Sequence, residues 1–281
     1  MPSKRLRTLT INGADIAVHE AGAGQPIVFV HGSLGDYRTW GAIQRKLQTN
    51  FRTISYSRRY NYPNATRWEQ KVYSPLLDAE DLLELLNQLS VQNAVVVASS
   101  FGGTAALHAA LIDTTRIAGL ILVEPALRGW LKDLANGEQL TDDFLDHAWL
   151  PAKVAFERGE GEEALGLLLD GFNGPGTFAQ FSPAMRRALM QNAWEMQLAL
   201  KQEPNVSYIS RSSVRGISLP TLLVCGDRSP KMYRLIAEEV LVQMEQARMV
   251  TIEGARHTVW IDQPGRFEEL IRAWIDATII D

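Results

Sequence analysis

Short apolar runs that alternate with helical patterns constrain the fold of this chain more than any other feature. The runs "AVVVAS" (94–99), "IAGLILVEP" (117–125) and "TLLVCGD" (221–227) are almost continuously apolar, which is typical of strands covered on both faces. Helical patterns lie between them, for example at 76–90 and 101–111. Because parallel neighbours need a crossover connection, this alternation predicts an α/β fold with a mostly parallel, doubly wound sheet.

The rest of the chain extends the same pattern and interrupts it once. Further strands are expected at 5–11, 16–20, 26–31, 51–57 and 248–254, and further helices at 39–47, 231–244 and 266–279. The interval 126–205 instead has helix-like patterns without a convincing strand. We therefore expect a core formed by 1–125 and 206–281, with a helical cap, or lid, of residues 126–205 inserted after the sixth strand.

Composition limits the partners of the chain. Its 281 residues are 46% hydrophobic, and 28 basic and 32 acidic residues give a formal charge of −4. This balance argues against nucleic acid and anionic membranes, and no apolar stretch approaches the roughly 20 residues of a membrane span. We expect a cytoplasmic protein that acts on a small molecule; the oligomeric state stays open. Cys225 is the only cysteine, which excludes an intramolecular disulfide, and its place in "TLLVCGD" indicates a small buried hydrophobe.

The segment "NAVVVASSFGGTAAL" (93–107) predicts an exposed nucleophile. A strand that turns sharply into its crossover helix holds the residue at the tip of the turn in a strained conformation and needs small residues two positions before and after it. Ser100 has Ala98 and Gly102 at these positions, whereas Ser99 has Val97 and Phe101. Ser100 is therefore the expected nucleophile; the alternative is an ordinary loop with a serine N-cap.

A serine hydroxyl needs a base, and the base needs a carboxylate that fixes its tautomer. Of the five histidines, only His257, in "EGARHTVW", follows a late strand in a loop that would expose it. Two carboxylates lie directly after apolar strands: Asp227 in "CGDRSP" and Glu124 in "LVEPA". Both give the order serine, acid, histidine. The tight turn allowed by the glycine before Asp227 favours Asp227, and Glu124 is kept as the alternative acid.

The oxyanion of an acyl-transfer intermediate needs backbone donors. The loop "HGSLGD" after the third strand offers the N–H of Ser33, and Phe101, at a helix N-terminus, offers the second N–H. No group of His, Cys or carboxylate residues has the spacing of metal ligands, so we expect neither metal nor cofactor.

These motifs resemble those of the α/β-hydrolase superfamily. The likeness covers nearly the whole chain through "VFVHGSLGD", "ASSFGG", "LLVCGD" and "GARHTVWIDQPGRF". It implies Ser100 as nucleophile, His257 as base, Asp227 as acid, and Ser33 and Phe101 as the oxyanion hole. Glu124 lies where some members of the superfamily, including certain lactonases, keep their acid.

The resemblance has two departures elsewhere. Ala98 replaces the first glycine of the elbow, which is sterically acceptable. "YSRR" (56–59) stands where many relatives carry D-x-R-G; Arg58 and Arg59 are expected at the surface or anchoring a loop.

A serine at the elbow implies an acyl-enzyme, in contrast to the superfamily's haloalkane dehalogenases and epoxide hydrolases, which use aspartate there. We expect a cofactor-independent serine hydrolase of a small to medium, mainly apolar carboxylic ester or lactone. The alternatives are a ligand receptor with slow, single-turnover hydrolysis and a C–C hydrolase or lyase that uses the same triad. Aromatic and large apolar residues of the cap would pack its core and line the pocket: Trp130, Phe144, Trp149, Phe156, Phe172, Phe178, Phe181, Met190 and Trp194.

Overall fold

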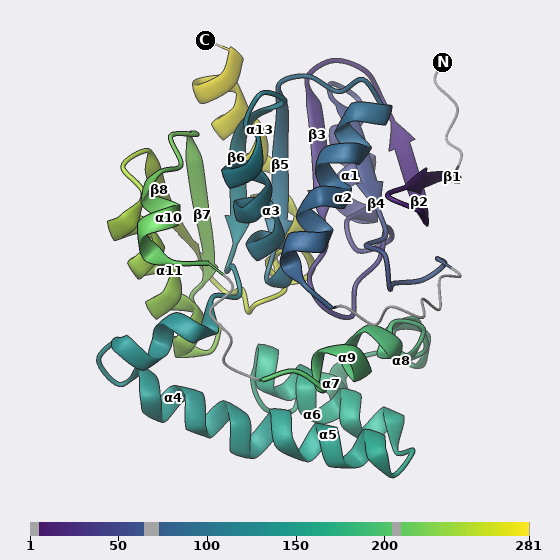
Figure 1. Cartoon of the computed structure of the whole chain (residues 1–281), viewed down its shortest axis with the longest axis vertical. Helices are drawn as coiled ribbons and strands as arrows, with labels where there is room; N and C mark the ends of the chain where they lie inside the picture. The colour runs from purple at the N-terminus through teal and green to yellow at the C-terminus, as the bar shows by residue number, and fades with distance from the viewer. Residues whose placement is uncertain (1–5, 65–72, 204–208, 281) are drawn as a thin grey trace.

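A single sheet organises the chain in the computed structural model, which describes residues 6–64, 73–203 and 209–280 (Figure 1). The described residues form eight strands in the order β1-β2-β4-β3-β5-β6-β7-β8. Strands β1 and β2 pair antiparallel, as do β2 and β4, and every other neighbouring pair is parallel. The strand bounds are β1 Leu6–Ile11, β2 Ala14–Ala21, β3 Pro26–Val30, β4 Arg52–Tyr56, β5 Ala94–Ser99, β6 Ile117–Val123, β7 Thr221–Gly226 and β8 Ala247–Ile252.

Helices connect the parallel strands and cover both faces of the sheet. Side chains of α2, α3 and α11 belong to the larger of two apolar clusters, and side chains of α1 and α13 belong to the other. The predicted α/β fold with a mostly parallel, doubly wound sheet is thereby confirmed. The helices that flank the sheet or lead into it are α1 Gly41–Leu47, α2 Pro75–Gln88, α3 Phe101–Ile112, α10 Arg211–Arg215, α11 Lys231–Gln243, α12 Val259–Asp262, α13 Pro264–Ile275 and the π-helix η3 Asp276–Ile280.

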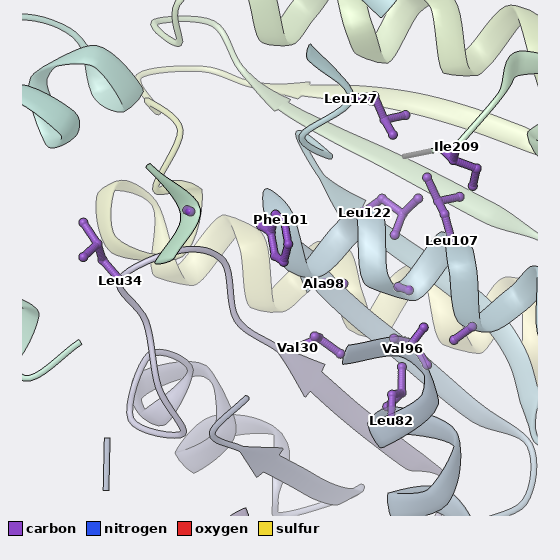
Figure 2. Packing of buried hydrophobic residues seen from close by; sticks show 14 of the residues in the cluster. Val30, Leu34, Leu82, Val96, Ala98, Phe101, Leu107, Leu122, Leu127 and Ile209 are labelled. Atoms are coloured by element: carbon purple, nitrogen blue, oxygen red, sulfur yellow. The ribbon is translucent and has the colours of Figure 1, made fainter. Parts of the chain in front are cut away.

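Strand β5 shows why its sequence is apolar at every position before its last residue, Ser99. Val96 and Ala98 pack into one cluster, while Val95 and Val97 pack into the other. Successive side chains of a strand point to opposite faces, so a central strand has no solvent-facing side. Figure 2 shows Val96 and Ala98 on this strand, close to Val30 of β3, Leu122 of β6 and the helices that cover this face.

Residues 126–203 form a helical segment between β6 and the chain that returns to β7. We call it the inserted segment; it lies beyond the end of β6 in Figure 1. The cap limit expected at 205/206 falls outside the described residues. The helices of the inserted segment are η1 Arg128–Asp133, α4 Gly137–Phe144, the π-helix η2 Leu145–Trp149, α5 Leu150–Glu157, α6 Gly161–Asn173, α7 Thr177–Gln180, α8 Pro183–Met190 and α9 Ala193–Ala199.

Candidate active site

Ser100 occupies the turn between β5 and α3. Its backbone has φ 51° and ψ −122°, a conformation that non-glycine residues rarely adopt and that recurs at functional sites. Gly102 makes this turn possible, because a Cβ atom there would lie 2.4 Å from the carbonyl oxygen of His31 and 2.8 Å from that of Val30. The carbonyl of Ser100 in turn accepts hydrogen bonds from the N–H groups of Gly103 and Ala126. The strained tip predicted from the sequence is therefore at Ser100.

His257 lies in the loop after β8 and is almost fully buried. Its Nδ1 lies 2.5 Å from Oε2 of Glu124, whose side chain is completely buried. The other carboxylate oxygen of Glu124 accepts a hydrogen bond of 2.8 Å from the N–H of Gly226. The ring of Tyr233, from α11, stacks on the imidazole with centroids 3.9 Å apart and planes inclined by 11°. The imidazole is thus fixed both at its edge and on its face.

The structure places Glu124 against His257 and Asp227, the acid favoured from the sequence, away from it. Asp227 is exposed, and its carboxylate accepts a hydrogen bond of 2.7 Å from the N–H of Gly254. The turn before it is tightly packed, since a Cβ atom at Gly226 would lie 2.2 Å from the carbonyl oxygen of Ala255. The short side chain of Asp227 is used in this local turn, and the carboxylate at the imidazole is that of Glu124.

The sheet order explains why a glutamate makes this contact. Glu124 follows β6, and the loop of His257 follows β8, so β7 lies between the two chain segments. The longer side chain spans that strand and receives the N–H of Gly226 from its end. Glu124 also has a positive φ of 46°. Two neighbouring strands, β5 and β6, are therefore each followed by a polar residue with a positive φ.

The two expected oxyanion donors border a small cavity beside the nucleophile. This cavity has a volume of about 40 Å³ and is lined by residues that include Ser33, Ser100 and Phe101. A cavity of this size exceeds the space that one water molecule requires. Phe101 begins α3, a helix of 12 residues, so its backbone N–H belongs to the positive end of the helix dipole. A carbonyl oxygen would fit beside Ser100 in this space.

A second cavity, of about 410 Å³, adjoins the same serine and also contacts His257. Phe172 and Phe181 of the inserted segment line it. Trp130, Phe144, Trp149 and Phe172 are buried in the larger apolar cluster, and Trp149 and Phe172 also line the smaller cavity. The remaining walls are mainly apolar, and Arg38 and Arg45 are the cationic residues among the described lining. The apolar lining also includes Leu34, Leu169, Met185, Leu189, Trp260 and Ile261.

Arg58 and Arg59 are not surface residues, which corrects one of the two positions expected for them. The side chains are 2% and 5% exposed and pair with Asp78 and Asp81 of α2. Burial opposes the charge of Arg58, but the carboxylates of Glu195 and Asp78 raise its pKa well above the usual value. The second expectation, that these arginines anchor a loop, agrees with hydrogen bonds from Arg58 to the carbonyl oxygens of His31 and Gly32.

His31 is a buried neutral imidazole beside the same loop. Burial, and after it the positive charge of Arg58, lower its pKa to about 4. Its Nε2 accepts the backbone N–H of Arg58 at 2.9 Å, so its Nδ1 carries the proton and donates to the carbonyl of Gly32 at 2.8 Å. The first histidine of "HGSLGD" therefore shapes the loop and does not line either cavity.

Sequence reasoning missed two of the groups around the site. Tyr233 has no motif around it, and only its position on a helix after β7 brings it to His257. Glu195 lies in the first turn of α9, a helix of the inserted segment, and is fully buried. An ionisable residue in an otherwise amphipathic helix carries no signal of such burial. The described ranges contain no cluster of three or more potential metal ligands, and none of their helices is long and apolar enough to cross a membrane.

An eight-stranded sheet with a serine at the strained end of β5 and a histidine–carboxylate pair beside it defines a class of hydrolytic enzymes. The model of the alpha/beta hydrolase family matches residues 27–270. The chain belongs to this family.

Individual relatives are distant but cover nearly the whole chain. An esterase of Escherichia coli (strain K12), YbfF, is 22% identical over 251 residues, which are 89% of this chain and 93% of the relative. The meta-cleavage product hydrolase from Pseudomonas fluorescens IP01 has a similar structure, with a TM-score of 0.75, 18% identity and coverage of 96% and 97% of the two chains. An N-acyl homoserine lactone degrading enzyme superposes with a TM-score of 0.74 at 21% identity, over 95% of this chain and 100% of the other.

Proposed function

We propose that this chain is a cofactor-independent serine hydrolase of small to medium, mainly apolar carboxylic esters or lactones. Ser100 is the nucleophile, His257 the general base and Glu124 the acid that orients it. The N–H groups of Ser33 and Phe101 form the oxyanion hole. The observation that carries this proposal is the buried contact of 2.5 Å between His257 and Glu124 beside a strained serine.

The acid determines which imidazole nitrogen reacts. A carboxylate at Nδ1 favours the tautomer with the proton on that nitrogen, which leaves Nε2 as the acceptor for the hydroxyl proton of Ser100. The side chains of Ser100 and His257 line the same cavity, and no hydrogen bond joins them in the described residues. Catalytic hydrogen bonds often tighten only when substrate binds, so this bond is expected in the complex.

The reaction proceeds in two halves. Ser100 Oγ attacks the carbonyl carbon, its proton passes to His257, and the carbonyl oxygen becomes an oxyanion held by two N–H groups. The imidazolium then protonates the leaving alcohol oxygen as the C–O bond breaks, which leaves an acyl-enzyme. Water, deprotonated by His257, attacks the acyl carbon and releases the acid and the free serine.

The cavities support the substrate class. A volume of about 410 Å³ lies within the range of small-molecule sites, and most of its walls are apolar. Arg38 lines this cavity and is paired with both carboxylate oxygens of Asp36, and Arg45, the other arginine of the lining, is exposed. We therefore propose that an uncharged, apolar group occupies this cavity, under a lid formed by the inserted segment.

A fluorophosphonate tests the nucleophile. Ser100→Ala should abolish covalent labelling, while Ser99→Ala should label normally. Ser99 is a matched control because its Oγ is fully buried and makes no hydrogen bond in the described residues. Labelling that persists in Ser100→Ala would contradict the assignment.

A panel of p-nitrophenyl esters and lactones of different ring size tests the reaction. Many turnovers per enzyme are expected with apolar members, and lower kcat/KM with members of equal size that carry an acidic group. A single burst followed by slow release would instead support a receptor. Cleavage of a vinylogous 1,5-diketone without ester turnover would support the C–C hydrolase alternative.

A further inference from the structure

The peptide between Gly32 and Ser33 has its orientation fixed by three hydrogen bonds to its carbonyl oxygen. The carbonyl oxygen of Gly32 accepts hydrogen bonds from His31 Nδ1 at 2.8 Å, Arg58 Nη2 at 3.2 Å and the N–H of Gly35 at 3.3 Å. In a trans peptide the C=O of one residue and the N–H of the next point in opposite directions. The N–H of Ser33 therefore points away from Arg58, and Ser33 lines both cavities.

The next peptide is held by a side chain of the inserted segment. The N–H of Leu34 donates to Oε2 of Glu195 at 2.9 Å. Leu34 has a positive φ of 62°, which a non-glycine residue keeps only where its surroundings enforce it. Figure 2 shows Leu34 on the loop that leaves β3, apart from Phe101 at the start of α3. Glu195 therefore supports the strained residue next to the proposed oxyanion donor.

Glu195 is fully buried, and among the described residues the hydrogen-bond donors to its carboxylate come from outside the inserted segment. Besides Leu34, its carboxylate accepts hydrogen bonds from Arg58 Nη2, from Asn61 Nδ2 at 2.7 Å and from Tyr73 OH at 3.0 Å. Burial opposes its charge, but Arg58 holds the pKa of Glu195 below its usual value. The negative charge of Glu195 is therefore balanced by the guanidinium of Arg58, which also binds the carbonyl oxygen of Gly32.

We propose that Glu195 is a positioning residue that makes a competent oxyanion hole depend on the seating of helix α9. The inference rests on the proposed function, because it assigns a role in acyl transfer to the Ser33 peptide. Seating of α9 places Glu195 against Leu34 and Arg58, and these two contacts fix the peptides on either side of Ser33. When α9 moves away, Leu34 loses its acceptor and the Ser33 N–H loses its fixed direction.

Glu195→Gln tests this role. The variant keeps an acceptor but loses the charge that pairs with Arg58. Removal of one oxyanion donor costs about 10²–10³ in kcat, so a misdirected donor should lower kcat by roughly 10- to 100-fold, with KM nearly unchanged. Rates are expressed per site titrated with fluorophosphonate, so that unfolded enzyme does not contribute.

A second readout reports the oxyanion hole directly. A trifluoromethyl ketone forms a hemiketal oxyanion on the serine, and the corresponding methyl ketone reports binding without it. In Glu195→Gln the inhibition constant of the trifluoromethyl ketone should rise in parallel with the loss of kcat, while binding of the methyl ketone stays near the wild-type value.

Asp81→Asn is the matched control for stability. It disrupts a buried pair with Arg59, in which both residues are at most 5% exposed, at a place that does not contact Gly32 or Leu34. This variant should lower Tm while kcat per titrated site and the inhibition constants stay within about threefold of wild type. A purely structural role for Glu195 would give its variant the same behaviour.

The outcomes separate the two proposals. Wild-type turnover with an unchanged kcat per site in Glu195→Gln overturns the positioning role alone, whereas absence of wild-type ester and lactone turnover overturns both. If Glu195→Gln does not fold, Arg58→Lys replaces it, because lysine keeps the charge but cannot match the fork that binds Gly32. An unchanged kcat per site in that variant likewise overturns the role.

Discussion

Glu124→Gln and Asp227→Asn form the sharpest pair of substitutions in this chain. Both remove a carboxylate charge with little change of shape, and both residues follow apolar strands that end at the same edge of the sheet. Only Glu124 contacts the imidazole of His257, at 2.5 Å, whereas Asp227 is exposed and bonds to the N–H of Gly254. The two variants should therefore differ in kcat far more than in stability.

The magnitude follows from the tautomer of His257. In Glu124→Gln the amide oxygen can keep the N–H of Gly226, and the amide N–H then faces Nδ1 of the imidazole. Nδ1 must become an acceptor, so the proton moves to Nε2 and blocks general-base catalysis. The analogous change in serine proteases lowers kcat by about 10⁴, which corresponds to about 5 kcal/mol of transition-state stabilisation.

Asp227→Asn should be nearly silent by comparison. It weakens one hydrogen bond at an exposed turn, which is worth about 1 kcal/mol of folding free energy or less, and kcat should stay within about threefold of wild type. The assay is hydrolysis of a p-nitrophenyl ester at saturating substrate, normalised to titrated sites, with Tm measured on the same samples. A loss above 100-fold in Asp227→Asn, with less than tenfold in Glu124→Gln, would refute the reasoning.

Three further predictions concern the elbow, the buried histidine and the cavity wall. Gly102→Ala should destabilise the fold by about 1–3 kcal/mol or more, because its Cβ would lie 2.4 Å from a carbonyl oxygen. The control Gly265→Ala, whose Cβ meets open space, should have a melting temperature near that of the wild type. Equal melting temperatures of the two variants would contradict this. The difference in unfolding free energy between the wild type and His31→Gln should increase from about pH 4 to 6.5. Burial lowers the pKa of His31 from 6.5 to about 4, so the unfolded chain binds more protons than the folded chain in this window. A difference that stays constant with pH in urea titrations would argue against this. Phe181→Ala should widen the cavity and raise kcat/KM for long acyl esters relative to short ones, and an unchanged ratio across a chain-length series would exclude Phe181 from the substrate wall.

The fold could be predicted because the composition of a strand reflects whether its two faces are covered. Residues 94–98 are apolar at every position since both faces of the strand are covered, and the predicted bounds Ala94–Ser99 match β5. The turn at Ser100 could also be located, because Gly102 is required by a contact that any residue with a Cβ would violate. Both features leave a local mark in the sequence: the apolar run of the strand, and the small residues two positions before and after Ser100.

The carboxylate at His257 and the contacts of the inserted segment depend on relations that the sequence does not encode locally. Glu124 and Asp227 both follow strands, and the choice between them depends on how far a side chain must reach across β7. Glu195 meets Leu34 across 161 positions of the chain, and nothing in its helix distinguishes it from an exposed glutamate. Such pairings follow from the final packing of the inserted segment on the core.

The reach of Glu124 across β7 has a consequence for engineering. Under the proposed triad, the turn that follows β7 contributes no reacting group. Its "CGD" motif would nevertheless be among the first segments that a protein engineer leaves unchanged. Asp227 and Arg228 are exposed there, and the backbone N–H of Arg228 is tied to the carbonyl of Ala255. A peptide tag or reporter inserted directly after Arg228 would keep this hydrogen bond and leave Tyr233 on its own helix. It would place a label beside the candidate active site without displacing the proposed reactive groups.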